Sequence, residues 1–141
     1  MRYSVRTHNE LLDLSSPRVM AIINITPDSF YTSCTSLSEK DILISAEKAI
    51  LEGADIVDLG ACSTRPGSQP VDAQQEWQRL APALCAIRHH WPHIPISVDT
   101  FRATIAEQAI LAGADIINDV YGGQSDEKMW DIIVWIIYQF F

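Results

Sequence analysis

The alternation of short apolar runs with longer amphipathic runs is the feature that most constrains how this chain can fold. Apolar runs of strand length occur at residues 19–23, 54–59, 94–98 and 114–118. Helical spacing of apolar residues connects them over residues 38–53, 72–91 and 100–113. Continuous apolar strands that alternate with helices are typical of a parallel sheet covered by helices. We therefore predict an α/β fold of four parallel β/α units, followed by a further helical stretch from Ser125.

The predicted helix boundaries carry capping signals. Ser38 is followed three residues later by Asp41, which is the spacing of a capping box. Asp72 is placed to cap the second helix, and Thr100 to cap the third. Pro82 lies inside the second helical pattern, where it predicts a kink or a break.

Two segments of the chain echo each other. Residues 50–58 and 110–118 share the tripeptide Gly-Ala-Asp between a helical pattern and an apolar run. The two copies lie two β/α units apart. Such self-similarity is consistent with a barrel built from repeated units, although helix-Gly-Ala-strand junctions occur in many α/β folds.

Composition excludes several classes of protein. Ten Lys and Arg against 18 Asp and Glu give a net charge of −8, which disfavours a non-specific nucleic-acid binder. Three cysteines, at positions 34, 62 and 85, form neither a disulfide framework nor a zinc motif. No apolar run reaches the roughly 18 residues of a membrane span. We therefore expect a cytoplasmic protein.

Polar residues stand where the predicted strands end. Asn24 and Asp99 come directly after an apolar run and Asn118 ends one, and the carboxyl ends of parallel strands form the active-site edge of such folds. These three residues favour a binding site, whereas Asp72 and Thr100 favour helix capping. We expect His89, His90 and His93 to lie on the surface at a helix end rather than to bind a metal. Cys62 is interpreted as a small loop residue rather than a reactive thiol. Trp77 and Trp91 are expected to pack in the core.

Three segments at these strand ends resemble one enzyme family. They are Val-Met-Ala-Ile-Ile-Asn-Ile-Thr-Pro-Asp-Ser-Phe at 19–30, Asp-Leu-Gly-Ala-Cys-Ser-Thr-Arg-Pro-Gly at 58–67, and Ile-Ser-Val-Asp-Thr-Phe at 96–101 with the second Gly-Ala-Asp copy. Together they resemble dihydropteroate synthases, which are pterin-binding TIM-barrel enzymes of folate biosynthesis and the targets of sulfonamides. The resemblance covers about residues 12–131. It implies that 1–141 is a single partial pterin-binding domain. This domain is the N-terminal half of a TIM (β/α)₈ barrel, truncated after about four strands, and 132–141 form a divergent apolar tail.

The resemblance implies a reaction. The family condenses 6-hydroxymethyl-7,8-dihydropterin diphosphate with p-aminobenzoate, and 7,8-dihydropteroate and diphosphate are formed with the help of Mg²⁺. The family's later residues, an aspartate, a lysine and a basic segment, have no counterparts in this chain. We therefore expect the 141 residues alone to be inactive. The implied partners are the two small-molecule substrates and, for the open sheet edges, a second copy of the chain as a homodimer.

The resemblance also implies roles for individual residues. Asn24 matches a contact to Mg²⁺ and the diphosphate, while Asp99 and Asn118 match residues that hydrogen-bond the pterin. The remaining matches lie in two loops that close over the diphosphate and shape the p-aminobenzoate pocket: Phe30 in the first, and Ser63, Thr64, Arg65 and Pro66 in the second. The chain departs from the family at Ala61 and Cys62, where glycine and glutamate are usual, and in the glycine-free segment 31–35.

Two alternative functions stay open at this point. One is a non-catalytic half-barrel remnant, which the missing half favours. The other is a pterin-binding barrel that transfers a methyl group to a corrinoid. The Ser-Thr-Arg-Pro-Gly motif disfavours the methyltransferase, because that reaction needs neither a diphosphate pocket nor an aminobenzoate pocket.

Overall fold

The structure is a computed structural model, and it describes residues 3–7, 11–26, 38–62 and 71–140. Its ten elements follow in chain order: β1 (Ser4–Arg6), β2 (Leu11–Asp13), β3 (Met20–Asn24), α1 (Glu39–Leu51), β4 (Ile56–Gly60), α2 (Ala73–His90), β5 (Ile96–Asp99), α3 (Ala103–Leu111), β6 (Ile116–Asn118) and α4 (Met129–Phe140).

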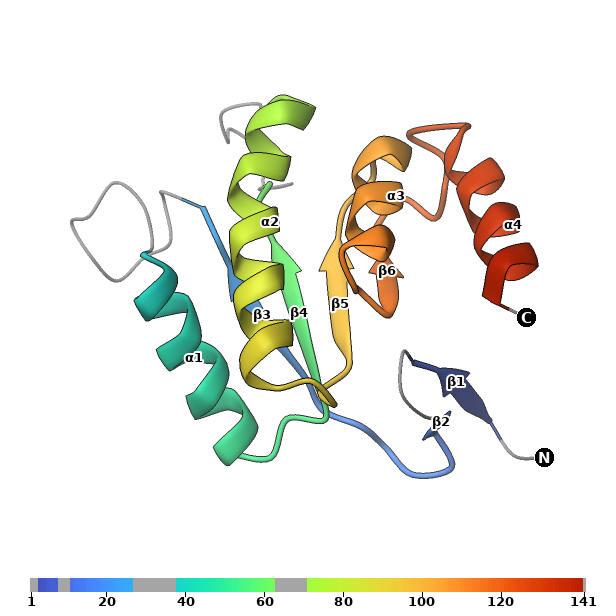
Figure 1. Cartoon of the computed structure of the whole chain (residues 1–141). Helices are drawn as coiled ribbons and strands as arrows, with labels where there is room; N and C mark the ends of the chain where they lie inside the picture. The colour runs from blue at the N-terminus through green and yellow to red at the C-terminus, as the bar shows by residue number, and fades with distance from the viewer. Residues whose placement is uncertain (1–2, 8–10, 27–37, 63–70, 141) are drawn as a thin grey trace.

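The central sheet has four parallel strands in the order β3-β4-β5-β6, which is also their order in the chain. Helices α1, α2 and α3 cover one face of this sheet (Figure 1). The predicted α/β fold of four parallel β/α units is therefore confirmed. The antiparallel hairpin of β1 and β2 was not predicted; it lies near the amino ends of the strands (Figure 1).

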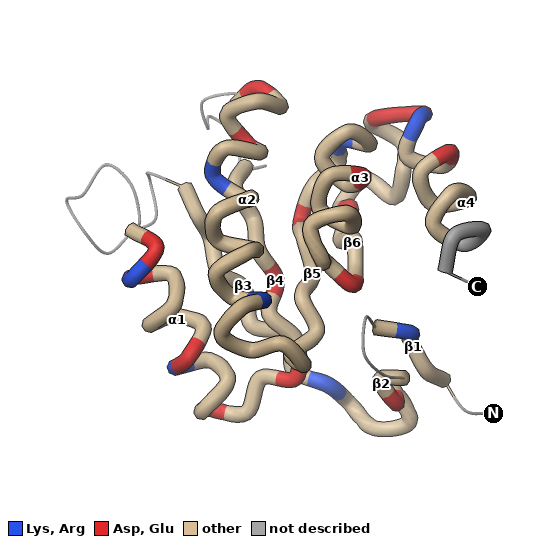
Figure 2. Tube along the Cα trace, in the orientation of Figure 1, with Lys and Arg blue, Asp and Glu red and all other residues tan. Residues whose placement is uncertain are grey.

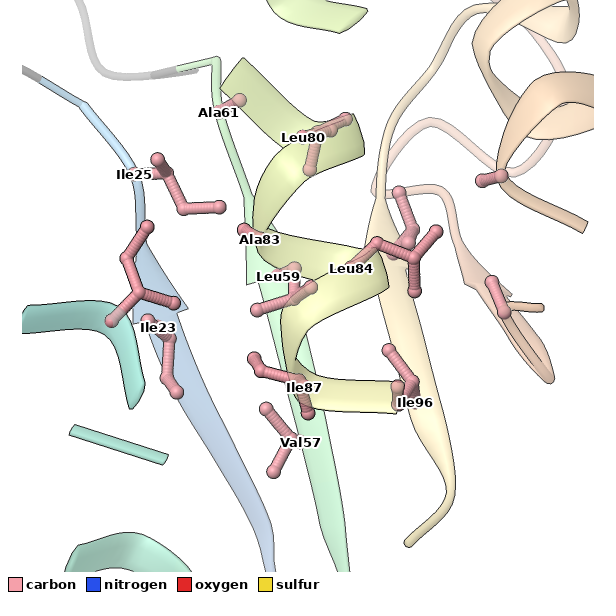
Figure 3. Close-up of a cluster of buried hydrophobic side chains, with 14 of the residues drawn as sticks. Ile23, Ile25, Val57, Leu59, Ala61, Leu80, Ala83, Leu84, Ile87 and Ile96 are labelled. Carbon is pink, nitrogen blue, oxygen red and sulfur yellow. The ribbon is translucent and has the colours of Figure 1, made fainter. Parts of the chain in front are cut away.

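The hydrophobic core fills the space between the sheet and α2. Leu80, Leu84 and Ile87 on α2 are completely buried against Val57 and Leu59 of β4 (Figure 3). Trp77 and Trp91 pack against the same core, as predicted, and are partly buried. Residues on the helix-covered face of each strand thus provide the apolar area that stabilises the fold.

Helix α2 runs through Pro82 without interruption, so the predicted break is wrong, while the alternative of a kink stays a prediction. Proline removes one backbone hydrogen bond and costs a helix interior about 3 kcal/mol. Burial of an entire face of α2 compensates for that loss, since tertiary packing supplies most of the stability of helices in proteins.

Two of the predicted helix caps are confirmed and one is wrong. Ser38 and Asp41 form the reciprocal capping box, and Asp72 accepts the backbone N–H of Gln75 at 2.8 Å. Thr100 does not cap α3, which begins at Ala103 with Arg102 at the N-cap position. The hydroxyl of Thr100 is instead committed to a buried side chain of α2, described below.

The repeated Gly-Ala-Asp tripeptides adopt the same structure twice. Gly53 and Gly113 have φ values of +101° and +103°, which glycine adopts without strain at a helix C-terminus. Asp55 accepts the backbone N–H of Val19 at 2.8 Å, and Asp115 accepts that of Ile96 at 2.8 Å. Each aspartate therefore ties the start of its own strand to the start of the neighbouring strand.

Both aspartates also pair with an arginine. Arg18 lies 2.9 Å from Asp55, and Arg88 lies 2.6 Å from Asp115. The Arg18–Asp55 pair joins the segments that precede β3 and β4, and Figure 2 shows basic and acidic segments side by side at the lower end of the sheet. The second is far more buried, because the side chain of Asp115 is only 1% exposed.

The three histidines near the end of α2 lie on the surface. His89, His90 and His93 are exposed at and just after the end of α2, as predicted.

Within the described part of the chain, no helix is long and apolar enough to span a membrane.

Candidate functional site

The sheet register brings the predicted site residues into one row. Asn24 pairs with Gly60, Gly60 with Asp99, and Asp99 with Asn118, so one residue of each strand contributes. Each is the last residue of its strand. Side chains alternate between the two faces of a strand, and the residues next to this row, such as Leu59 and Val98, point into the helix-covered core. The row therefore lies on the opposite face, which is the interior side of a barrel.

Gly60 forms a gap in the middle of this row. A β-carbon added to Gly60 would lie 3.6 Å from Oδ1 of Asn24 and 3.6 Å from Oδ2 of Asp99. The two oxygens therefore converge on the space above the glycine from the strands on either side. A bare backbone at this position leaves room for a ligand to approach both oxygens.

The next row toward the amino ends contains a buried acid. Asp58 and Ser97 are partners in the register of β4 and β5 and lie on the same face as Gly60 and Asp99. Asp58 is 2% exposed and Ser97 is completely buried. Nδ2 of Asn118 donates to Oδ2 of Asp58 at 3.3 Å. Among the described residues, Oδ1 of Asp58 and Oγ of Ser97 have no hydrogen-bond partner.

The electrostatic environment of the site is strongly acidic. Burial, followed by the neighbouring carboxylates of Asp58, Glu76 and Asp119, raises the pKa of Asp99 to about 6. Asp119 directly follows the row and accepts the backbone N–H groups of Tyr121 at 2.9 Å and Gly123 at 2.7 Å. Asp99 is thus a carboxyl group whose pKa, at about 6, lies well above the usual range of aspartate.

A second buried acid supports the loop after β5. Glu76 on α2 is completely buried and accepts the hydroxyl of Thr100 at 2.7 Å. Arg102 pairs with the other carboxylate oxygen of Glu76 and donates to the carbonyl of Val71 at 2.6 Å. These contacts fix Thr100 and Arg102, the first and third residues after Asp99, and so hold the end of β5 in place.

The loop residues predicted for the site lie outside the described residues. They are Phe30, Ser63, Thr64, Arg65 and Pro66. Of the positions that depart from the family pattern, Ala61 is buried and its carbonyl accepts Arg79 at 3.2 Å, while Cys62 is half-buried. The structure therefore brings together three of the predicted site residues, Asn24, Asp99 and Asn118.

Comparison with known proteins shows which family the chain belongs to. A family profile described as "Pterin binding enzyme" matches residues 20–136. The chain belongs to the pterin-binding enzyme family. The resemblance found in the sequence motifs is thereby confirmed.

Curated relatives of the chain include proteins named for folate synthesis and dihydropteroate synthases. It is 45% identical over 115 residues to the folic acid synthesis protein fol1 of Pneumocystis carinii, and 43% identical over 111 residues to dihydropteroate synthase of Bacillus subtilis. These alignments cover 82% and 79% of the chain but 15% and 39% of the relatives. A protein of Mycobacterium leprae named inactive dihydropteroate synthase 2 is 43% identical over 114 residues, which are 81% of the chain and 38% of that relative.

Solved structures show the same relationship. Burkholderia cenocepacia dihydropteroate synthase complexed with 7,8-dihydropteroate has a TM-score of 0.77 and 34% identity, covering 92% of the chain and 42% of that protein. The Xanthomonas albilineans enzyme with 4-aminobenzoic acid has a TM-score of 0.81 and 32% identity, covering 94% and 49%. The four parallel units of the chain therefore match the first half of a dihydropteroate synthase TIM barrel, and the chain spans less than half of each protein compared.

The oxygens of the row suit a hard metal ion. Oδ1 of Asn24, at the edge of the Gly60 gap, is a hard amide oxygen that can ligate Mg²⁺. Among the described residues, no group of three or more His, Cys, Asp or Glu side chains forms a metal cage. Mg²⁺ typically uses one or two protein oxygens together with substrate phosphates, so this sparse donor set fits it.

Sequence reasoning missed Asp58 and Glu76. Asp58 is the first residue of the second family motif and lies inside an apolar run. Its position two residues before Gly60 places it on the same face as the site row, and that period of two was a usable signal. Glu76 gave no comparable signal, because its contact with Thr100 joins elements that are far apart in the chain.

Proposed function

We propose that this chain carries the pterin- and diphosphate-binding half of a dihydropteroate synthase. The reaction joins the amine of p-aminobenzoate to the methylene carbon of 6-hydroxymethyl-7,8-dihydropterin diphosphate. A carbon–nitrogen bond forms, the carbon–oxygen bond to diphosphate breaks, and the amine loses a proton. The observation that carries this proposal is the single row of Asn24, Gly60, Asp99 and Asn118 across four strands.

The residues of this row divide the binding task. A pterin ring presents several N–H donors along one edge, and the carboxylate of Asp99 and the amide oxygen of Asn118 are acceptors one strand apart. Asn24 lies two strands from Asp99, on the other side of the Gly60 gap. We assign it to the diphosphate end of the substrate.

Mg²⁺ bound beside Asn24 would neutralise the negative charge of the departing diphosphate. The chain's own contribution is to hold the pterin at Asp99 and Asn118, so that its methylene carbon faces the diphosphate side of the row. Correct orientation of the reacting carbon is a major part of the barrier reduction in such displacements. Phe30, Ser63, Thr64, Arg65 and Pro66 are proposed to complete the diphosphate and p-aminobenzoate pockets.

Several finer assignments belong to the same proposal. They are the cytoplasmic location, sensitivity to sulfonamides, the homodimer, and the absence of turnover by the 141 residues alone. A non-catalytic pterin-binding protein is the second candidate, and the relative named inactive, at 43% identity, favours it. The two candidates share pterin binding and differ only in turnover.

Titration calorimetry with 6-hydroxymethyl-7,8-dihydropterin diphosphate, with and without Mg²⁺, tests the proposal. The chain is expected to bind the substrate more tightly with Mg²⁺, and Asn24→Ala to weaken that binding about tenfold, the scale of a lost polar contact to a charged group. Gln108→Ala removes an exposed amide from α3 and serves as the control, with no effect expected. Unchanged, Mg²⁺-dependent affinity in Asn24→Ala would remove Asn24 from the site.

An assay of 7,8-dihydropteroate formation then separates the two candidates. The chain alone is expected to bind substrate without turnover. A chimera that carries residues 20–136 in place of the matching segment of the Bacillus subtilis enzyme is expected to turn over. An inactive chimera that still binds the pterin would favour the non-catalytic candidate, and failure of the chain to bind pterin would overturn both.

A further inference from the structure

We propose that Asp58 is a positioning residue, which fixes the orientation of the Asn118 amide so that its oxygen is presented to the ligand. This inference rests on the proposed function, because it concerns how the row of site residues recognises a pterin. It adds a residue that none of the predicted site roles includes. The observation behind it is the hydrogen bond from Nδ2 of Asn118 to Oδ2 of Asp58, at 3.3 Å.

The chemistry of the pair determines its direction. A carboxylate oxygen can only accept, so the amide group of Asn118 must turn its nitrogen, and not its oxygen, toward Asp58. The nitrogen and oxygen of a carboxamide lie on opposite sides of the same carbon. When Nδ2 of Asn118 donates to Asp58, its Oδ1 points away from the row that contains Asp58. The exposed Asn118 then offers an acceptor rather than a donor to a ligand above the row.

The position of Asp58 makes it a rigid support. It is the middle residue of β4, whose residues are all buried, and it is 2% exposed. The strand holds its backbone on both sides, through pairing with β3 and β5. A buried side chain on a central strand loses little further freedom when it orients a neighbour.

This orientation of the Asn118 amide makes the row selective for ligands that present hydrogen-bond donors. Pterins carry an amino group and ring N–H groups on one edge, which need acceptors, and Asp99 supplies one acceptor in the same row as Asn118. With the amide reversed, its NH₂ group would face that edge, and two donors would oppose each other. A buried donor left without an acceptor weakens binding, because its lost hydrogen bond to water is not replaced. Asp58 thus makes the row an acceptor surface.

The first experiment is a spectrum of the Asn118 side-chain amide in the 141-residue chain without ligand, by ¹⁵N NMR. One of its two protons is expected to be shifted downfield and protected from exchange. Asp58→Asn keeps one acceptor oxygen but adds a competing NH₂ donor, so it is expected to reduce both effects. Ser97→Ala is the matched control, since Ser97 is also buried, lies beside Asp58 in the register, and has no hydrogen-bond partner among the described residues. An unshifted, freely exchanging amide in the unmutated chain would overturn the proposal, whether or not the variants fold.

The second experiment is a double-mutant cycle with 6-hydroxymethyl-7,8-dihydropterin diphosphate at pH 8, where Asp99 is ionised. Asp58→Asn is expected to weaken binding about fivefold in the unmutated chain and to have no further effect in Asn118→Ala, because it acts through that amide. An equal loss in both backgrounds would show that Asp58 acts independently of Asn118, and would overturn the proposal. If the unmutated chain binds no pterin, the proposed function fails, while the amide spectrum still decides the role of Asp58.

Discussion

The aspartates at the two ends of the parallel sheet have opposite environments. At the amino end, Asp55 and Asp115 each accept a backbone N–H group of the neighbouring strand, and each pairs with an arginine. At the carboxyl end, within the described residues, neither Asp58 nor Asp99 forms an ion pair, and one oxygen of Asp58 has no partner.

The pKa values express the same difference. The backbone N–H of Val19, followed by Arg18, lowers the pKa of Asp55 below its usual value. Burial and nearby carboxylates raise the pKa of Asp99 to about 6. The amino end is therefore arranged for stability, and the carboxyl end holds unsatisfied acceptors at a cost in stability. This division is typical of β/α barrels, whose active sites lie at the carboxyl ends of the strands.

The largest expected effect is on stability, at the amino end. Arg88 donates to the carbonyl of Gly113 at 2.8 Å, to that of Ile94 at 2.9 Å and to Asp115. Arg88→Ala would remove the guanidinium that pairs with the buried carboxylate of Asp115 and caps two backbone carbonyls, so the free energy of unfolding should fall by about 3 kcal/mol in urea denaturation. Arg18→Ala breaks the more exposed ion pair and should cost less. An equal or greater loss in Arg18→Ala would contradict the account.

A pair of glycine variants separates binding from stability. Gly60→Ala places a methyl group at ordinary contact distance between the oxygens of Asn24 and Asp99. It should preserve folding but weaken binding of the pterin diphosphate by about tenfold or more. Gly53→Ala at the amino end should do the reverse, because its positive φ strains alanine and lowers the free energy of unfolding by about 1 kcal/mol. Calorimetry and thermal unfolding of both variants measure this, and parallel changes in the two would contradict the division between the ends.

A smaller effect should follow from the charge around Asp99. Ionised Asp99 is the acceptor for the pterin, so affinity should rise with pH through a midpoint of about 6. Asp119→Asn removes one of the carboxylates that raise the pKa of Asp99 and should move this midpoint to lower pH. Isothermal titrations from pH 5 to 8 would show the shift. A midpoint that stays in place would mean that Asp119 does not act on Asp99.

Much of the fold could be predicted from the sequence because its signals are local. Apolar runs predicted the four strands, and capping residues predicted the starts of α1 and α2. The site row was predicted at Asn24, Asp99 and Asn118 because each ends an apolar run. In parallel strands of matching register, such residues must meet at one edge.

The parts that sequence did not predict depend on contacts between distant segments. Glu76 holds Thr100 from another element, so Thr100 looked like a helix cap. Pro82 looked like a helix breaker because the buried face of α2 cannot be weighed before the sheet is known. The β1–β2 hairpin consists of two three-residue strands, too short for a clear alternating pattern.

Asp99→Asn tests the central claim most directly, with pterin diphosphate affinity and thermal stability measured on the same protein. The pKa of Asp99 is higher in the folded state than in the unfolded state, so the ionised carboxylate destabilises the fold above pH 6. This loss of stability disappears as the pH falls toward 4. The account predicts about tenfold weaker binding together with greater stability at pH 8, and an advantage that shrinks toward pH 4. Asp55→Asn, at the amino end, should instead lower stability at pH 8 and leave binding unchanged. If Asp99→Asn lowers stability at pH 8 while binding stays intact, Asp99 is a structural residue and the proposed site is wrong.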